Sequence, residues 1–186
     1  MPKFIIEHLE EEVYDWCFIE YKSMSKIVGK ENLIITNLKN PKDREKLEPF
    51  CEAKEESVLK MNLNNTCLLD MGAEKELSPD DKFEYLVFGG ILGDNPPQER
   101  TVKFLANLKS EKRHLGKVQM STDNAVLTAK LIAVDKKSFE KIKFIDNPEI
   151  PMEDGLELRL PYRFVEVDGK PYISAELLLH IKKSGF

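Results

Sequence analysis

Residues 83–101, FEYLVFGGILGDNPPQERT, decide the fold. The run FEYLVF is aromatic and aliphatic apart from Glu84, which predicts a buried strand. The glycines at 89, 90 and 93 then permit a sharp turn and let another group approach the main chain closely. In α/β sheets, ligands bind at such turns at the carboxyl ends of strands. The spacing matches neither the dinucleotide pattern G-x-G-x-x-G nor a P-loop, so a ligand loop and an ordinary strand-to-helix turn both stay open.

Size and charge narrow the class of protein. The chain has 186 residues, enough for one substantial α/β domain, with 41% hydrophobic and 33% charged residues. Its 28 basic and 33 acidic residues give a net charge of −5. Because an acidic protein has no bulk attraction for phosphate backbones, a basic protein or peptide fits better as a partner than nucleic acid.

Cysteines and histidines do not form a metal or disulfide pattern. The three cysteines (17, 51 and 67) contain no C-x-x-C, and the three histidines have no ligand spacing. We therefore expect no metal site and no disulfide framework. Residues 1–30 contain no apolar run of signal-peptide or membrane length, so we expect a soluble, cytoplasmic protein without a membrane partner.

Strands and helices alternate along most of the chain, which predicts a mostly parallel α/β sheet flanked by helices. The expected strands are 3–9, 32–38, 66–71, 83–88, 111–115 and 141–147. The expected helices are 13–28, a polar one over roughly 43–56, 99–108, 121–134 and 175–183. The dipeptide Asp168-Gly169 is a hairpin signal. We expect a single domain over 1–186, with a β-hairpin and a helix from about 156 as an appendage.

Two polar clusters stand where a ligand site is expected. Glu7, His8 and Glu10 stand at the C-terminal end of the first strand, where they either line a site or, like the acids at 11 and 12, complement the dipole of the next helix. The run Ser121-Thr122-Asp123 is rich in N-cap residues. Helix N-termini bind polar ligand atoms readily, although an ordinary capped helix explains this run equally well.

Two longer motifs carry a family resemblance. FGGILGDNPPQERT (88–101) and RHLGKVQMSTDNAV (113–126) resemble the SPOUT class of S-adenosylmethionine-dependent methyltransferases, and most closely its protein-arginine methyltransferase branch. The resemblance extends nearly end to end. It implies a SPOUT fold with a C-terminal trefoil knot and S-adenosyl-L-methionine as the cofactor. The cofactor-binding residues that it implies are Phe88, Gly89, Gly90, Ile91, Gly93, Leu115, Gly116, Gln119, Met120, Ser121, Thr122 and Ala125.

An arginine acceptor sets a chemical requirement. Arginine is always protonated and is a poor nucleophile, so a carboxylate pair is needed to hold the guanidinium and accept a proton. The candidate catalytic acids are Glu7, Glu10, Glu20 and Asp94, with His8 as a possible proton carrier. Many RNA-modifying members carry a catalytic arginine in the first helix, whereas this chain has no arginine before Arg44.

The expected function is therefore methyl transfer to an arginine of a basic protein, with a ribosomal protein as the expected substrate and a monomer as the expected state. Two alternatives stay open. One is an RNA methyltransferase of the same fold, which predicts a basic groove beside the cofactor. The other is a non-catalytic knotted binding module that holds no cofactor.

Overall fold

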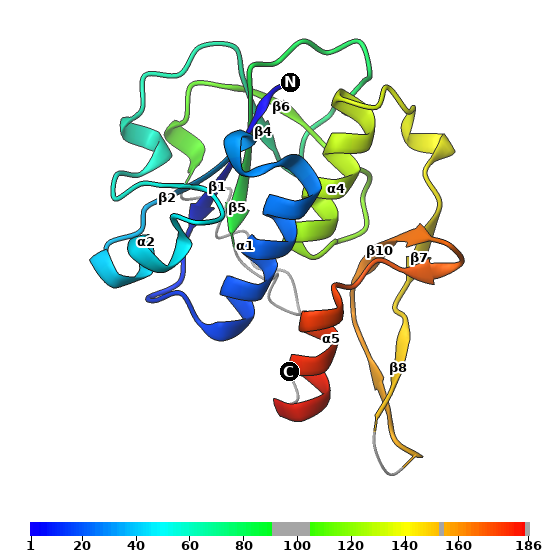
Figure 1. Cartoon of the computed structure of the whole chain (residues 1–186). Coiled ribbons are helices and arrows are strands. Elements are labelled where there is room, and N and C mark those ends of the chain that lie inside the picture. The colour runs from blue at the N-terminus through cyan, green and yellow to red at the C-terminus, as the bar shows by residue number, and fades with distance from the viewer. Residues whose placement is uncertain (91–104, 153–154, 185–186) are drawn as a thin grey trace.

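A six-stranded parallel sheet forms the centre of the protein (Figure 1). The structure is a computed structural model, and it describes residues 1–90, 105–152 and 155–184. The strand order is β3-β2-β1-β5-β4-β6. The strands are β1 (Lys3–His8), β2 (Leu33–Thr36), β3 (Glu52–Ala53), β4 (Thr66–Leu69), β5 (Tyr85–Gly90) and β6 (Glu111–Arg113). The predicted mostly parallel α/β sheet is confirmed.

Alternation along the strands divides the core between the two faces of the sheet. Phe4 and Ile6 join a large apolar cluster with helices α1 (Asp15–Val28) and α4 (Thr122–Ala133), which lie together in front of the sheet in Figure 1. Ile5 lies in a separate cluster with residues of the 3₁₀ helices η2 (Val58–Lys60) and η3 (Leu105–Asn107). The face of the sheet on which a side chain of β1 lies therefore decides which elements it contacts.

The strand order reverses direction between β1 and β5. From β1 the chain builds outward through β2 to β3, whereas β4, β5 and β6 lie on the other side of β1. Ligands of open parallel sheets bind outside the carboxyl ends of the strands at such a switch point. Here the switch point is marked by the neighbouring residues His8 and Gly90.

The polar helix predicted over roughly 43–56 is wrong in extent. The structure has α2 (Pro41–Leu47), which begins at the capping residue Asn40 and is followed by β3, a short strand parallel to β2. Pro49 explains the early end. Proline lacks an N–H, and its ring clashes with the carbonyl four residues earlier, so the helix cannot continue past Glu48.

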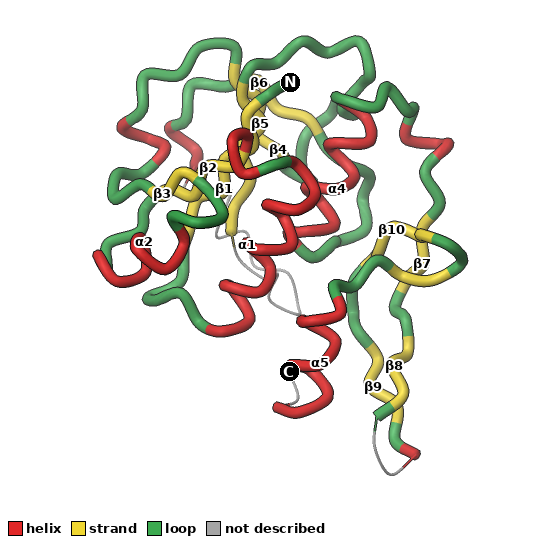
Figure 2. Tube along the Cα trace, in the orientation of Figure 1, coloured by secondary structure: helices red, strands yellow, loops and turns green. Residues whose placement is uncertain are grey.

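The C-terminal part adds two small antiparallel sheets and a helix (Figure 2). Its elements after η4 (Phe139–Lys141) are β7 (Phe144–Asp146), β8 (Glu149–Pro151), β9 (Glu157–Arg159), β10 (Arg163–Val167), β11 (Lys170–Pro171) and α5 (Ala175–Ser184). The predicted hairpin turn is confirmed, because Asp168 and Gly169 have φ values of 52° and 76° between β10 and β11. Helix α5 packs on α1, where Leu177 meets Ile19.

Glu7 joins three elements on the face of the sheet away from α1. Its side chain is fully buried and accepts hydrogen bonds from Thr36 Oγ1 (2.5 Å), Ser57 Oγ (2.6 Å) and the Val58 N–H (2.9 Å). Both carboxylate oxygens are therefore occupied by β2 and by the start of η2. A buried charge that is hydrogen-bonded in this way holds its neighbours in register.

We predict that Glu7→Ala lowers the free energy of unfolding by about 3 kcal/mol or more, because a hydrogen bond to a charged group contributes about 1.5–3 kcal/mol. Urea denaturation followed by circular dichroism measures the change. Glu45→Ala, on the exposed surface of α2, is the control and should change stability by less than about 0.5 kcal/mol. Equal stability of the two variants would contradict a structural role for Glu7.

Candidate active site

The carboxyl ends of β1 and β5 bring the first predicted residues together. Gly89 lies opposite Glu7, and Gly90 lies opposite His8, in the parallel register of these strands. Phe88, one residue earlier, is a core residue that is 3% exposed and stacks on Phe4 with ring centroids 6.3 Å apart. The remaining residues predicted for this loop, Ile91, Gly93 and Asp94, lie outside the described residues.

The three segments predicted to bind the cofactor share one apolar cluster. Phe88 at the end of β5 and Leu115 after β6 are both buried in the cluster beneath α1 and α4. Met120 and Ala125 pack against the same cluster. The structure thus brings side chains of all three segments to one face of the sheet. Their contact with a cofactor stays a prediction.

The segment between β6 and α4 has a constrained backbone. Gly116 has a φ of 84°, and a β-carbon there would lie 2.7 Å from Phe139 Cζ, so the position requires glycine. The Gly116 N–H donates to His114 Nδ1 at 3.1 Å. Further along, the Gln119 carbonyl accepts a 2.8 Å hydrogen bond from the Arg163 N–H, so β10 holds this segment in place.

A saturated polar network fills the N-terminus of α4. Ser121 is the N-cap residue, and its Oγ donates to Asp123 Oδ1 at 2.7 Å. Asn124 Nδ2 lies 3.1 Å from the same carboxylate oxygen and 3.0 Å from Ser121 Oγ. Asp123 and Asn124 are 1% and 0% exposed, and Thr122 is also buried. The predicted N-cap is confirmed, although Ser121 bonds to a side chain rather than to the helix backbone.

Glu20 faces this network from α1. Its side chain is 2% exposed, and Oε1 has no hydrogen-bond partner among the described residues. Burial raises the pKa of Glu20 well above its usual range, and the nearby Asp123 raises the pKa further. Burial also raises the pKa of Asp123, against the opposing effect of its hydrogen bonds. Two buried carboxyl groups with a free oxygen between helices form a site suited to a cation.

His8 lies on the same face of the sheet as α1. Its Nδ1 is 2.8 Å from Tyr21 Oη, and its Nε2 is buried without a hydrogen-bond partner among the described residues. Burial lowers the pKa of His8, although the Asp43 carboxylate opposes that effect. The imidazole is therefore favoured in its neutral form, which can accept a proton.

The other acidic candidates are placed differently. Glu7 points to the opposite face of the sheet from Glu20, and its oxygens are already hydrogen-bonded. Glu10 is half-buried in the segment that joins β1 to α1. The catalytic roles predicted for both residues stay predictions. Asp123 was not among the predicted catalytic acids, and its place in the STDN motif was the only sequence signal for it.

No metal centre is present in the described ranges, where no group of three histidine, cysteine or acidic side chains could hold an ion. The described helices also include none that is long and apolar enough to cross a membrane.

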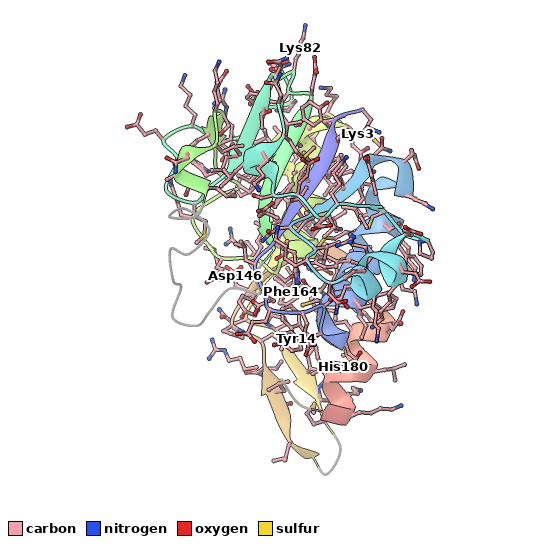
Figure 3. All side chains as sticks on the ribbon, turned by 90° about the vertical axis from the view of Figure 1, so that its left-hand side faces the viewer. Lys3, Tyr14, Lys82, Asp146, Phe164 and His180 are labelled. Carbon is pink, nitrogen blue, oxygen red and sulfur yellow. The ribbon has the colours of Figure 1, made fainter. Side chains whose placement is uncertain are left out.

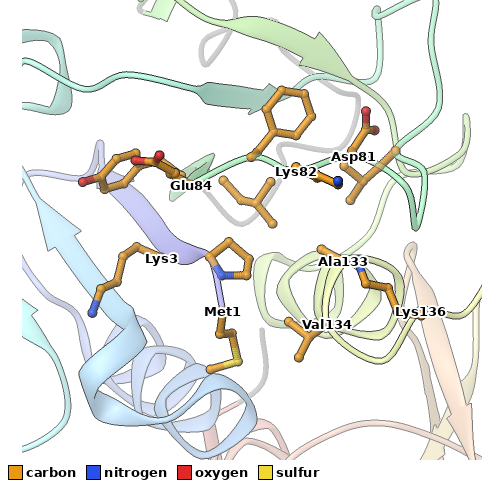
Figure 4. Close-up of a pocket in the computed structure, with 13 residues that line it drawn as sticks. Met1, Lys3, Asp81, Lys82, Glu84, Ala133, Val134 and Lys136 are labelled. Atoms are coloured by element: carbon orange, nitrogen blue, oxygen red, sulfur yellow. The ribbon is translucent and has the colours of Figure 1, made fainter.

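A pocket of about 640 Å³ lies at the amino-terminal ends of the strands, on the opposite side of the sheet from the candidate site (Figure 4). Its lining includes Lys3, Lys82 and Lys136, which surround the amino-terminal ends of β1 and β5. Figure 3 shows Lys3 and Lys82 at one end of the molecule and Tyr14, which follows the carboxyl end of β1, toward the other. The pocket is therefore separate from the candidate active site.

Comparison with known proteins shows which family the chain belongs to. The family model described as "Protein arginine N-methyltransferase SFM1-like" matches residues 3–185. The protein arginine N-methyltransferase SFM1 of Saccharomyces cerevisiae is 37% identical over 97% of this chain and 94% of its own. The crystal structure of the yeast SFM1 complexed with SAH, at 38% identity, matches with a TM-score of 0.89 over 97% of this chain and 94% of that one.

A more distant structure shows the fold alone. The dual-specific Trm10 from Thermococcus kodakaraensis is 19% identical and has a TM-score of 0.61 over 76% of this chain and 96% of that one. The fold is thus that of the SPOUT class of methyltransferases. Within that class, the chain belongs to the SFM1-like family of protein arginine N-methyltransferases.

We predict that Glu20→Gln stabilises the protein at neutral pH. Since folding raises the pKa of Glu20 above its usual 4.5, its contribution to stability is complete below that pH and is lost as the pH rises toward the folded pKa. Glutamine is neutral, so the variant should gain about 1–3 kcal/mol over the parent at neutral pH and nothing at pH below the usual value. Urea denaturation at several pH values measures the difference. Glu11→Gln, an exposed control, should show no such dependence.

Proposed function

We propose that this protein transfers a methyl group from S-adenosylmethionine to an arginine side chain of another protein. The observation that carries the proposal is the burial of Glu20 and Asp123 on neighbouring helices, with Oε1 of Glu20 unpaired among the described residues. A guanidinium presents several N–H donors in a planar fork and matches two carboxylates better than any other common side chain does.

The residues at the carboxyl ends of the strands suit the cofactor. Gly89 and Gly90 leave the end of β5 without side chains, where main-chain groups can contact an adenosine. Leu115 and Met120 supply apolar walls on the α4 side. Ser121 and Thr122 place backbone N–H groups at a helix N-terminus, which suits the cofactor's carboxylate. When bound, S-adenosylmethionine supplies an electrophilic methyl group on sulfur.

The residues of this chain prepare the acceptor. The free Oε1 of Glu20 accepts a hydrogen bond from the guanidinium and aligns one nitrogen toward the methyl group. Asp123, held by Ser121 and Asn124, supplies the second carboxylate and takes the proton that this nitrogen loses. The burial of both groups excludes water and strengthens the contact with the cation.

The two alternative functions fit these observations less well. An RNA methyltransferase needs cationic groups at its site, whereas two acids lie here in a protein of net charge −5. A purely structural scaffold gains nothing from an unpaired buried carboxylate, which destabilises the fold. The arrangement is explained when a cationic ligand completes it.

Further parts of the proposal extend the family resemblance. We infer that the acceptor belongs to a basic protein such as a ribosomal protein, that the enzyme works as a cytoplasmic monomer, and that its C-terminal part forms a trefoil knot. The acidity of the chain and of its site supports a basic partner, because opposite charges accelerate association.

The test is transfer of labelled methyl groups to purified small-subunit ribosomal proteins and, separately, to ribosomal RNA. We expect label in protein, on arginine, and none in RNA. Glu20→Gln and Asp123→Asn should each lower the transfer rate by about a hundredfold or more, while S-adenosylmethionine binding by calorimetry stays within a few-fold. Glu11→Gln is the matched control and should retain full activity.

Two outcomes would overturn the proposed function, and a third would overturn the roles of Glu20 and Asp123. Label in RNA would indicate the RNA-modifying alternative. No binding of S-adenosylmethionine to the parent protein would indicate the scaffold. Full activity of both the Glu20→Gln and Asp123→Asn variants would show that the guanidinium is held elsewhere.

A further inference from the structure

Methyl transfer to arginine releases one proton in every turnover. The acceptor nitrogen uses its lone pair to form the N–CH₃ bond, and the electrons of the broken S–CH₃ bond stay on sulfur. The cofactor loses its positive charge while the methylated guanidinium keeps its own. One N–H proton must therefore pass from the acceptor nitrogen to the protein and then to water.

The groups that can receive this proton are isolated from solvent. Glu20 is 2% exposed and Asp123 is 1% exposed. A carboxyl group that stays protonated cannot serve as the base in the next turnover. The proton needs a route from this buried pair to the surface.

The two oxygens of Asp123 have different neighbours. Oδ1 is occupied by Ser121 Oγ at 2.7 Å and Asn124 Nδ2 at 3.1 Å. The hydrogen bond to Oδ2 comes from Ser23 Oγ, at 3.5 Å. Oδ2 is thus the oxygen from which a proton can be passed on.

Ser23 also contacts a second hydroxyl group, that of Tyr172. Ser23 on α1 is 2% exposed, and its Oγ lies 3.4 Å from Tyr172 Oη. Tyr172 follows β11 and is half-buried. Both contacts are long, as acid–base contacts often are before substrate is bound. The series Asp123, Ser23 and Tyr172 leads from a buried carboxyl group to a residue that is only half-buried.

We propose that Ser23 and Tyr172 form a hydroxyl relay that carries the proton released by the acceptor arginine from Asp123 to solvent. The proposal rests on the proposed function, since it needs Asp123 to receive that proton. Neither hydroxyl touches the acceptor, and both act through Asp123.

The relay leaves both hydroxyl groups unchanged. Protonated Asp123 gives its proton to Ser23 Oγ, Ser23 gives its own to Tyr172 Oη, and Tyr172 gives its own to water. Rotation of the two hydroxyls then restores the starting arrangement, in which Ser23 donates to Asp123.

Asn124 keeps the relay aligned. Its Nδ2 also donates to the Tyr172 carbonyl at 3.0 Å, and its Oδ1 accepts from the Val165 N–H at 2.9 Å. One fully buried side chain therefore fixes Asp123 relative to Tyr172 and β10. The two ends of the relay cannot drift apart without breaking these bonds.

The test uses Ser23→Ala and Tyr172→Phe in the full-length protein, with small-subunit ribosomal proteins as the acceptor. Each variant should lower kcat by about tenfold or more, with the acceptor KM and S-adenosylmethionine affinity within twofold of the parent. The solvent deuterium isotope effect on kcat should rise. Imidazole in the buffer should restore part of the activity of Tyr172→Phe, because it can accept the proton in place of the phenol.

Two matched controls separate the relay from a structural effect. Ser25→Ala removes another hydroxyl from α1, one that bonds the Phe50 carbonyl. Tyr85→Phe removes a phenol at the opposite edge of the sheet, beside the pocket. Both should keep the parent kcat and isotope effect.

A second measurement needs no substrate. In D₂O at mildly acidic pH, the infrared C=O band of a buried protonated carboxyl shifts as its hydrogen exchanges. Exchange should slow by about tenfold or more in Ser23→Ala if this route carries the proton. Unchanged exchange, or a Tyr172→Phe variant with the parent kcat, overturns the relay. If Asp123→Asn keeps full activity, Asp123 does not receive the proton and the relay is wrong, whereas failure of the parent protein to label any arginine would overturn the proposed function.

Discussion

Two carboxyl groups buried in the protein interior, one on α1 and one on α4, set the main constraint on this structure. Burial disfavours a charge on Glu20 and on Asp123, and a charge on Asp123 further disfavours one on Glu20. The fold stabilises Asp123 with three hydrogen-bond donors but leaves one oxygen of Glu20 unpaired among the described residues. A cost of this kind persists where a ligand offsets it, and the ligand that offsets two acids is a cation.

The parallel sheet explains why this pair lies where it does. At the switch point between β1 and β5, the strands end in His8 and in two glycines. Helix α1 follows the carboxyl end of β1. Helix α4 packs beside α1, and both helices cover the same apolar cluster. The acids on the two helices are thereby held close to the strand ends that would bind a cofactor. The pocket at the amino-terminal ends of the strands is lined by none of these residues.

The parts of the fold that depend on local pattern could be predicted from the sequence. The apolar runs predicted β1, β2, β4 and β5, the glycines marked the end of β5, and Ser121 marked the start of α4. The helix over 43–56 was wrong because its alternating charges outweighed Pro49 in the prediction. The pairing of Glu20 with Asp123 could not be predicted, because it joins residues 103 positions apart through helix packing. For the same reason Glu7 looked equivalent to Glu20, although alternation along β1 places it on the other face of the sheet.

The C-terminal part is joined to the candidate site by polar contacts as well as by packing. Asn124 hydrogen-bonds to β10 and to the Tyr172 carbonyl while also holding the Asp123 carboxylate. An apolar interface tolerates small shifts, but buried hydrogen bonds of fixed length do not. Movement of the C-terminal part would therefore displace Asp123 from its position against Glu20. Methyl transfer by this family member thus depends on residues far along the chain from the glycine-rich turn that first marks its fold.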